Sequence, residues 1–424
     1  MINTIAAHGF SADLLGFSAI DRYLGRDCLP FVTVVTDADI SDLARIFEGL
    51  RFPGVAIADG AADEAGWAWY FLCRDPELPP VSALCRSPND RQPCFKLLDF
   101  NQDGRTGRFR DPWGVYPWLR QIKTGNADTA KKTVYTHGYT HVDTHTTEPW
   151  WKNCNSGGGK SRAFMEAALI LARYCDEEEY RPKLLKEIIR SLQCLNEDQI
   201  PGAEGQRLLL LGILASPNPG LGLEFLKNAG LLEELWPELA ELDQVDQSKE
   251  FHPEGNAWKH TLETFRYRKA AAHNGALAGP MSYDARLSLG LLLHDLGKAH
   301  AESSGAHRFE GHAELGARQA RRFLERLGFE GALVADICYL VRNHMLPAAL
   351  PRLPLTRTQE VLESPLFPVL LELYRCDESS SFKGLDGYYE SSAAYQAYLK
   401  HRRNPYRLAD GKKMGKREML GRTR

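Results

Sequence analysis

The spacing of apolar residues changes at about residue 161, and this change divides the chain into two kinds of structure. Before it, short segments rich in β-branched and aromatic residues are bounded by Gly, Pro and Asp, which is typical of β-strands. These segments are 31–35, 54–58, 67–72 and 94–100, with a predicted helix over 41–50. After it, apolar residues recur every three to four positions, the period of an amphipathic helix. The pattern predicts an α+β chain with a mixed first part and an all-α remainder.

At 424 residues the chain is too long for a single hydrophobic core. We predict a small mixed α/β head over 1–123 and a linker rich in Thr, Gly and Asn over 124–160. An all-α neck over 161–246 and an all-α second domain over 247–400 follow, and a basic tail covers 401–424.

The formal net charge is −3 at pH 7, so any nucleic-acid contact requires a local basic region. The tail supplies one, because ten Lys and Arg residues between Lys400 and Arg424 face only Asp410 and Glu418. A solvated tail is the plainer interpretation of such a charge run.

The nine cysteines form no CxxC pair, which argues against a disulfide framework and a zinc knuckle and favours reduced thiols. The N-terminus lacks the basic start and apolar core of a signal peptide. The longest apolar runs, such as 208–211 and 289–293, are too short to span a bilayer. We therefore predict a cytoplasmic protein with no membrane partner.

Histidines and aspartates in the second helical domain lie at or near the ends of helical runs. His294 and Asp295 are adjacent and follow an apolar run, and the others are His260, His312, His344 and Asp377. Imidazole nitrogen and carboxylate oxygen together favour a divalent metal such as Mn, Fe, Co, Ni, Zn or Mg. We predict a metal at His260, His294, Asp295 and Asp377, with His312 and His344 as second-metal ligands or phosphate contacts.

A plainer interpretation exists for each residue alone, because a single His near an apolar helix is usually a hydrogen-bonded core residue. The His294–Asp295 pair fits that interpretation poorly, since an unpaired carboxylate buried in an apolar run costs several kcal/mol.

Four segments carry a resemblance to a known family. FHPEGNAWKHT (251–261), LGLLLHDLGKA (289–299), RFEGHAELGA (308–317) and VRNHM (341–345) resemble the HD domain attached to bacterial tRNA nucleotidyltransferases and poly(A) polymerases. GLLEELWPELAEL (230–242) also resembles the neck of that family.

The resemblance implies metal ligands at His260, His294, Asp295 and Asp377, and a phosphate-steadying Lys298. With Asp295 and Lys298, His312 and His344 complete the implied catalytic set. The implied reaction is hydrolysis of phosphodiesters and phosphomonoesters, including 2′,3′-cyclic phosphates. Asn256 departs from the family, which usually has Asp there; this change removes a charge but no expected ligand.

The same resemblance implies a nucleotidyltransferase-like head, which needs a Gly-Gly turn for the triphosphate and an Asp-x-Asp pair for two Mg²⁺. Here the turn reads Gly16-Phe17-Ser18, and Phe31 and Thr33 stand where the aspartates belong. Phe and Thr cannot replace metal-binding carboxylates. Only a shift in register would bring Asp37 and Asp39 to the turn.

The expected arginines of the neck are also missing, because their positions hold Ala163, Glu166 and Leu169. We therefore predict a degenerate, inactive head. Its candidate nucleotide contacts are Gly16, Ser18, Asp37, Asp39 and Lys160.

Two other patterns have plainer explanations. SGGGKS (156–161) has Cys154 where a P-loop needs its first Gly, so a flexible linker is favoured. His137, His141 and His145 would share one face of a strand, but a Thr-rich exposed hairpin is favoured over a metal site.

The favoured function is metal-dependent phosphohydrolysis of a nucleotide or an RNA 3′ end, with tRNA as a candidate partner. The first alternative is a tRNA 3′-end nucleotidyltransferase, CCA-adding or poly(A) polymerase-like, which requires Asp37 and Asp39. The second is a non-catalytic RNA-binding protein whose HD site has become structural.

Overall fold

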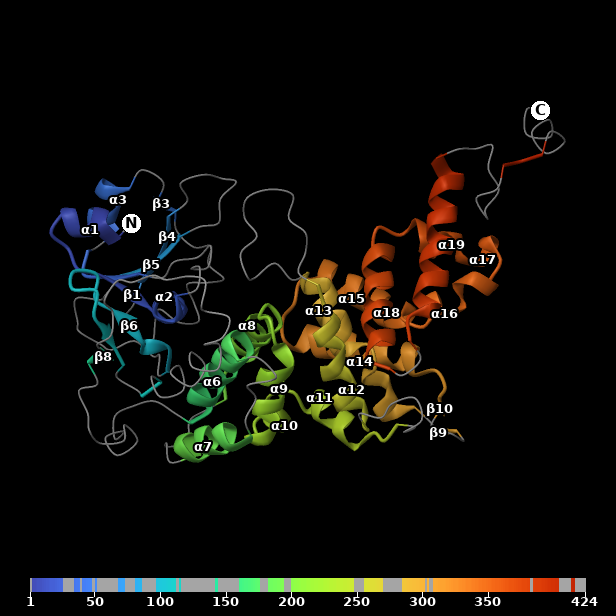
Figure 1. Ribbon diagram of the computed structural model, residues 1–424, viewed down its shortest axis with the longest axis horizontal. Helices are drawn as coiled ribbons and strands as arrows, with labels where there is room; N and C mark the ends of the chain where they lie inside the picture. The colour runs from blue at the N-terminus through green and yellow to red at the C-terminus, as the bar shows by residue number, and fades with distance from the viewer. Residues whose placement is uncertain are drawn as a thin grey trace. The chain divides into compact units, whose positions relative to one another are not determined.

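The computed structural model of the protein is shown in Figure 1. It describes residues 2–25, 34–38, 40–47, 50–51, 68–72, 81–85, 97–111, 114–115, 142–143, 160–175, 182–193, 200–247, 255–269, 284–301, 303–304, 308–381, 384–403 and 413–415. The chain divides into two compact units, Met1–Leu231 with Ala272–Ser282 and Leu232–Ala271 with Tyr283–Arg424. The division into five segments proposed from the sequence stays a prediction.

The first unit is built on a mixed sheet. Its strands are β1 (Ala12–Leu15), β2 (Val34–Thr36), β3 (Leu50–Arg51), β4 (Ala68–Leu72), β5 (Val81–Cys85), β6 (Asn101–Gln102), β7 (Phe109–Arg110) and β8 (Val142–Asp143). They lie in the order β3-β4-β5-β2-β1-β6-β7-β8. β1 pairs antiparallel with β2, with Ala12 opposite Thr36 and Leu14 opposite Val34, while β2 and β5 are parallel.

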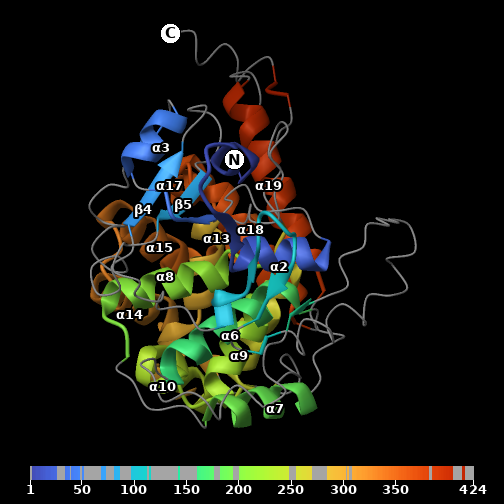
Figure 2. The same ribbon diagram turned by 90° about the vertical axis from the view of Figure 1, so that its left-hand side faces the viewer.

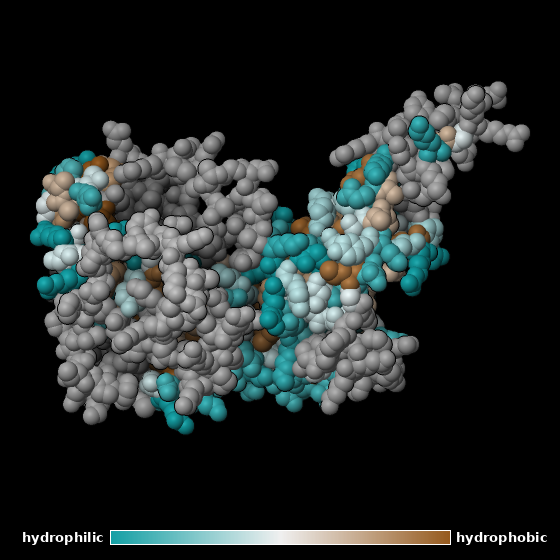
Figure 3. All heavy atoms as spheres, in the orientation of Figure 1, coloured by the Kyte–Doolittle hydropathy of each residue, from teal (hydrophilic) through white to brown (hydrophobic). Residues whose placement is uncertain are grey.

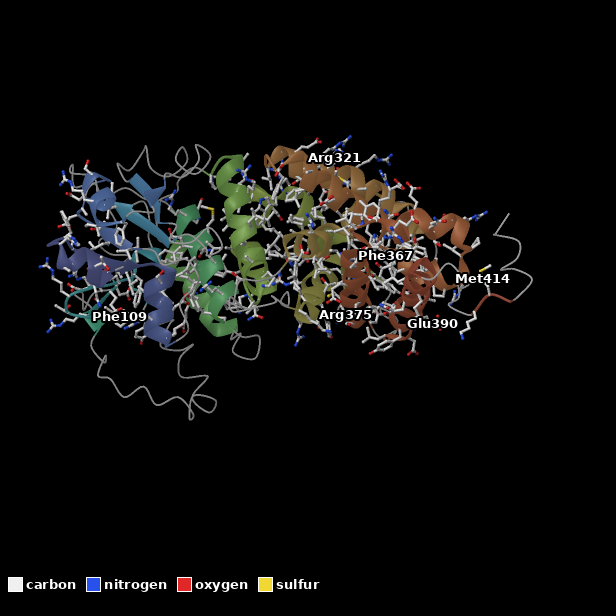
Figure 4. The ribbon with its side chains drawn as sticks, turned by 90° about the horizontal axis from the view of Figure 1, so that it is seen from above. Phe109, Arg321, Phe367, Arg375, Glu390 and Met414 are labelled. Atoms are coloured by element: carbon white, nitrogen blue, oxygen red, sulfur yellow. The ribbon has the colours of Figure 1, made fainter. Side chains whose placement is uncertain are left out.

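Three helices accompany this sheet, α1 (Ile2–Ala7), α2 (Phe17–Leu24) and α3 (Ile40–Ile46). The predicted strands at 31–35 and 67–72 correspond to β2 and β4, and the predicted helix at 41–50 corresponds to α3. The predicted strand at 54–58 lies outside the described residues. Phe109, labelled in Figure 4, stacks on Phe100 with ring centroids 5.8 Å apart, and Tyr23 packs edge-on against both rings.

The predicted strand at 94–100 is wrong over its described part, 97–100. Leu97–Asp99 form a 3-10 turn, η1, and the strand β6 begins only at Asn101. Leu97, Leu98 and Phe100 are all buried, so the apolar residues do not alternate between two faces as strand residues do. A short apolar run cannot distinguish a strand from a buried turn.

The rest of the first unit is helical. It contains α6 (Lys160–Tyr174), α7 (Pro182–Gln193), α8 (Ala203–Leu214) and α9 (Pro219–Asn228). α6 and α9 pack side by side, as Figure 2 shows. Gly222 of α9 makes this approach possible, because an added Cβ would lie 2.7 Å from the carbonyl oxygen of Ala168 on α6.

The second unit is almost entirely helical. Its helices are α10 (Leu232–Leu235), α11 (Pro237–Ala240), α12 (Ala257–Thr264), α13 (Ala285–Leu293), α14 (His312–Arg326), α15 (Gly331–Asn343), α16 (Leu346–Ala349), α17 (Leu355–Glu363), α18 (Phe367–Ser379) and α19 (Asp386–Arg403). Short 3-10 turns include η5 (Glu241–Gln244), η6 (Phe265–Tyr267), η7 (Leu296–His300) and η8 (Leu350–Arg352). A two-residue hairpin, β9 (Ser303–Ser304) with β10 (Arg308–Phe309), interrupts the helices. The predicted α+β class with an all-α C-terminal part is confirmed.

α13 is the central helix of this unit. Every residue from Leu287 to Leu293 is buried. Gly290 lets α18 approach closely, because an added Cβ would lie 2.8 Å from Leu373. This burial explains the apolar run in the sequence and holds the end of α13 rigidly in the core.

Hydrophilic residues cover most of the described surface of the second unit (Figure 3). Arg321 on α14 is exposed and points outward in Figure 4. Within the described residues, no helix combines the length and apolar character needed to cross a bilayer.

Candidate metal centre

His260 is presented by α12, whose N-terminus is fixed by Asn256. The Asn256 carboxamide oxygen accepts a hydrogen bond from Lys259 N at 3.0 Å, and its Nδ2 donates to the backbone oxygen and the carboxylate of Asp243 at 2.9 and 2.8 Å. An Asp at this position could cap the helix but could not donate to Asp243. The departure from the family pattern at Asn256 therefore has a structural counterpart in Asp243.

His294 and Asp295 follow directly after α13, where the buried helix delivers both into the core. His294 is 1% exposed and Asp295 is 2% exposed. Asp295 is the N-cap residue of η7, which packs against α14. Gly297 permits this packing, since an added Cβ would lie 2.0 Å from the carbonyl oxygen of His312. The sequence between Asp295 and Lys298 thus brings α14 and its His312 to the site.

One group of side chains surrounds oxygen Oδ2 of Asp295. His260 Nε2 lies 3.8 Å and His294 Nε2 3.3 Å from this oxygen. Asp377 Oδ1 completes the group, at 3.0 Å from His260 Nε2 and 3.9 Å from His294 Nε2. The four residues predicted to bind a metal are therefore assembled, and His260, His294 and Asp377 form one set with the spacing of metal ligands.

A second group surrounds the other carboxylate oxygen, Oδ1 of Asp295. His312 Nε2 and His344 Nε2 lie 3.8 and 3.9 Å from it and 3.1 Å from each other. Asp295, His312 and His344 form a second set with the spacing of metal ligands. Asp295 thus faces both groups, one with each carboxylate oxygen.

The hydrogen bonds at Nδ1 decide which ring nitrogens face the centre. Nδ1 of His294, His312 and His344 lies 2.7–2.8 Å from the backbone oxygens of Leu291, Phe309 and Val341. A carbonyl oxygen only accepts, so each Nδ1 carries a proton and donates it. The Nε2 atoms are consequently left to bind a metal, the arrangement typical of metal-ligating histidines.

His260 reaches the same state through Ser380. The Ser380 hydroxyl donates to the backbone oxygen of Asp377 at 2.6 Å, so it accepts from His260 Nδ1 at 3.3 Å. The Nε2 of His260 then faces the Asp377 carboxylate, a contact that is favourable only with a positive charge between them. That charge is either a second proton on His260 or a metal ion.

Two further observations show that a cation fits this centre. His294 Nε2 is buried and has no hydrogen-bond partner in the described part of the chain. Burial, followed by the neighbouring imidazole of His294, lowers the pKa of His344 to about 4, and burial also lowers the pKa of His312. Both rings are therefore neutral near pH 7, and their facing lone pairs at 3.1 Å repel each other unless a cation joins them. The residues present therefore fit a divalent metal ion, and to that extent the predicted cofactor is confirmed.

The carboxylates remain ionised despite their burial. Burial alone would raise the pKa of Asp295, but the adjacent imidazole of His294 and the ammonium group of Lys298 hold it well below its ordinary range. Burial opposes ionisation of Asp377 as well, but the hydrogen bond and charge of His260 lower its pKa below the ordinary range. Both groups are therefore available as anionic ligands.

Lys298 lies at the edge of the centre. Its Nζ donates to Asp295 Oδ2 at 2.6 Å and to the side-chain oxygen of Gln247 at 2.7 Å. The side chains of Asp377, His312 and Lys298 are 21%, 13% and 11% exposed, whereas those of His260, His294, Asp295 and His344 are at most 2% exposed. Solvent therefore reaches the centre beside Asp377, His312 and Lys298. Gln247 and Ser380 could not be singled out from the sequence, because neither residue type is a usual metal ligand.

Among the described candidate nucleotide contacts of the head, Asp37 lies apart from Gly16 and Ser18. Gly16 follows the end of β1, with a φ of 59°, and Ser18 is buried in α2. Asp37 is exposed and accepts a hydrogen bond from Ser11 N at 2.6 Å, at the opposite end of β1. The antiparallel register of β1 and β2 produces this separation. Asp39, Phe31 and Thr33 lie outside the described residues.

The neck positions that lack arginine are part of the core of the first unit. Ala163 is fully buried, and Leu169 is partly buried. The buried Glu166 accepts a hydrogen bond from Leu98 N at 2.9 Å, close to the Gly16 turn. Lys160 is the first residue of α6. The stretches that contain His137, His141, His145 and Cys154 lie outside the described residues, as does most of the basic tail.

Comparison with known proteins identifies the class of the second unit. Residues 258–375 match the HD domain family, so this part of the chain is an HD domain. The match contains five of the six candidate metal ligands, from His260 to His344, together with Lys298, and ends two residues before Asp377.

The chain is also similar to tRNA nucleotidyltransferases. It is 41% identical over 133 residues to the multifunctional CCA protein of Halorhodospira halophila, which covers 31% of this chain and 29% of that protein. It is 36% identical over 152 residues to the CC-adding tRNA nucleotidyltransferase of Thermus thermophilus, covering 35% and 33%. It is 32% identical over 189 residues to the A-adding tRNA nucleotidyltransferase of Deinococcus radiodurans, covering 43% and 40%. The chain thus spans about a third of the length of the curated relatives it matches, and the resemblance stated from the motifs is confirmed over that part.

Among solved structures, the CCA-adding enzyme of Bacillus stearothermophilus in complex with CTP is 14% identical to this chain, with a TM-score of 0.47. The comparison covers 94% of this chain and 81% of that one.

Proposed function

We propose that the second unit is a divalent-metal-dependent phosphohydrolase acting on phosphoesters of nucleotides or RNA 3′ ends. The observation that carries this proposal is the sharing of Asp295 between two groups of ligands. One carboxylate oxygen faces His260 and His294, and the other faces His312 and His344. This arrangement suits two ions bridged by one carboxylate, as in many enzymes that displace an oxygen at phosphorus. A cytoplasmic location and tRNA as a partner belong to the same proposal.

In this proposal each residue has a definite task. His260, His294 and Asp377 would hold one ion, His312 and His344 the other, and Asp295 both. Such ions supply a Lewis acid for the phosphoryl oxygens and an activated water for attack on phosphorus. Nδ1–H donation to backbone oxygens fixes each imidazole in the tautomer that presents Nε2. Lys298 orients Asp295 through its hydrogen bond and places a positive charge beside the solvent-accessible edge, where a phosphate would bind.

The test uses the purified full chain with Mn²⁺ or Ni²⁺ and 2′,3′-cyclic AMP as substrate. Hydrolysis adds water across one P–O ester bond and yields a nucleoside monophosphate, which chromatography resolves. We expect turnover that a chelator abolishes and that Mn²⁺ restores. His300→Ala is a matched control, because His300 lies in the same turn as Lys298 but is exposed and pairs with Glu241. Absence of metal-dependent turnover on cyclic, 2′- and 3′-phosphates would contradict the proposal.

A second candidate function is addition of nucleotides to tRNA 3′ ends. The names of the relatives favour it, since the matched proteins include CC-adding and A-adding tRNA nucleotidyltransferases. The described head argues against it, because Asp37 lies at the end of β1 opposite the Gly16 turn. Glu166 also places a carboxylate near that turn, where a triphosphate would need a positive charge. Incorporation of labelled ATP or CTP into tRNA in the presence of Mg²⁺ would establish this second function.

A further inference from the structure

Gln247 lies beside the metal centre and has no task in the mechanism above. Its backbone belongs to a short antiparallel pairing between residues 245–247 and 255–257. Gln247 N donates to Gly255 O at 3.2 Å, and Ala257 N donates to Val245 O at 2.9 Å. Residue 257 is the first of α12, the helix that carries His260. The position of Gln247 is therefore fixed relative to a metal ligand.

The orientation of the Gln247 side chain follows from its contact with Lys298. An ammonium group only donates hydrogen bonds, so the carboxamide oxygen must face Nζ, at 2.7 Å. The same Nζ donates to Asp295 Oδ2. The ammonium group of Lys298 is thus held by two hydrogen-bond acceptors, Gln247 and Asp295. The carboxamide nitrogen, Nε2, necessarily points away from the ammonium group.

This Nε2 is an unsatisfied donor. It is buried and has no hydrogen-bond partner in the described part of the chain, and Gln247 as a whole is 5% exposed. A buried amide donor without an acceptor is unfavourable, and such groups are uncommon unless they serve a ligand. The neighbouring cationic Lys298 makes an anionic acceptor the natural partner.

We propose that Gln247 is a positioning residue for Lys298 and that its Nε2 donates a hydrogen bond to a phosphoryl oxygen of the substrate. The proposal rests on the proposed phosphohydrolase function and adds a substrate contact to it. Gln247 and Lys298 together form one wall of a phosphate site whose opposite wall is the Asp295 centre. The ligand class is a phosphate monoester or diester.

Two substitutions separate the roles of the carboxamide oxygen and nitrogen. Gln247→Glu keeps an acceptor for Lys298 and removes the donor, whereas Gln247→Met removes both and keeps the approximate volume. Gln244→Glu is the matched control, since Gln244 is an exposed residue of the adjacent turn and receives the same charge change. Thermal unfolding of each variant shows whether it folds, and if Gln247→Met does not, Gln247→Glu still tests the donor.

The probe is inorganic phosphate, titrated calorimetrically into the Mn²⁺-loaded full chain. We expect the dissociation constant to rise by about 10- to 100-fold in both Gln247 variants, the loss typical of a hydrogen bond to a charged group. The number of Mn²⁺ ions bound per chain should not change in either Gln247 variant. The dissociation constant for phosphate should not change in the Gln244→Glu control. With substrate, Gln247→Glu should mainly raise KM, while Gln247→Met should also lower kcat because Lys298 loses its anchor. A purely structural role would not produce this difference between the two variants.

Phosphate binding of wild-type strength in Gln247→Met, or in Gln247→Glu, overturns the inference. A wild-type chain that binds phosphate through Gln247 but hydrolyses no phosphoester supports the inference and contradicts the proposed reaction. A wild-type chain that takes up no Mn²⁺ contradicts both.

Discussion

The head and the HD domain both bury acidic side chains, but they satisfy them in opposite ways. In the head, Asp21 is 1% exposed and receives hydrogen bonds from Arg173 and Tyr174, each at 2.8 Å. In the HD domain, Asp295 accepts a hydrogen bond from Lys298, but both of its oxygens also face imidazole Nε2 atoms, and the histidine protons lie on Nδ1. The first arrangement is complete within the protein, whereas the second leaves imidazole lone pairs that a cation from outside would join. A buried carboxylate thus indicates a metal site where the nitrogens around it are acceptors.

The same contrast applies to the two positions that the family uses for phosphate chemistry. Phe17 takes the place of the second glycine of the turn, and its ring packs 5.2 Å from the Arg173 guanidinium and 6.2 Å from the Tyr174 ring. In this head, a half-buried aromatic ring that packs against Arg173 and Tyr174 occupies that position. The HD centre keeps Asp377, His312 and Lys298 open to solvent.

The largest expected effect is that of His294→Ala on hydrolysis. Nε2 of His294 is a buried nitrogen with no hydrogen-bond partner among the described residues, so its removal should eliminate one ion and lower kcat by about 10³-fold or more. The fold should persist, because Ala is well tolerated at a helix end. Steady-state kinetics with 2′,3′-cyclic AMP measures the loss, and circular dichroism measures the fold. Wild-type activity in this variant would show that the HD centre, like the head, does not depend on a bound cation.

The next effect concerns the head, where Asp21→Ala removes the buried carboxylate that pairs with the Arg173 guanidinium. We expect a loss of about 3–5 kcal/mol in the free energy of unfolding of the head, the usual cost of breaking a buried ion pair by removing one member. Phosphohydrolysis by the second unit should not change. Denaturant unfolding provides the measurement, and Asp42→Ala, which affects a pair with an exposed Arg45, is the control. An equal loss in both variants would show that Asp21 is not the buried anchor.

Gly297→Ala tests the contact that brings η7 to α14. The added Cβ would meet the carbonyl oxygen of His312, so we expect the two elements to separate at a cost of about 1–3 kcal/mol in stability. Hydrolysis should fall as well, because Asp295 and His312 would no longer share a centre. Gly331→Ala is the control, since a Cβ there has nothing within 4 Å. Unchanged activity in Gly297→Ala would mean that His312 is not required.

The smallest expected effect is that of Asn256→Asp. The new carboxylate would still cap α12 but would face the Asp243 carboxylate in place of donating to it. We expect a loss of about 1 kcal/mol in stability and little change in kcat. Adding Asp243→Asn should restore stability, because the donor and acceptor have then only exchanged places. Failure of the double variant to recover would contradict the exchange.

The sequence was sufficient to predict the members of the centre but not their arrangement. His294, Asp295 and the apolar run before them are adjacent in the sequence, so a local pattern was enough to identify them. The division of the ligands into two groups depends on which carboxylate oxygen of Asp295 each histidine faces, and this is set by packing across α12, α13, α14, α15 and α18. Ser380 and Gln247 act through contacts more than 50 residues apart in sequence, for which spacing carries no signal.

The head shows the opposite limit of sequence-based prediction. Residues 94–100 looked like a strand because their apolar run was short, yet Leu98 and its neighbours turn inward to meet Glu166, 68 residues away. Long helical segments were predicted well: α6 and α9 lie in the region predicted to be helical, and α14 buries one face at the period that the sequence displays. Tertiary contacts determine the secondary structure of the short segments, whereas the local sequence pattern is enough to predict that of the long ones.

The most direct test of the central claim is the number of divalent ions bound per chain. Mn²⁺ titration of the full chain, followed by calorimetry or metal analysis, should give two ions per chain in the wild type. Asp295→Ala should abolish binding of both, because each ion would be held by one oxygen of that carboxylate, and Asp37→Ala in the head should change nothing. Uptake of no Mn²⁺, or uptake that survives Asp295→Ala, would contradict the account.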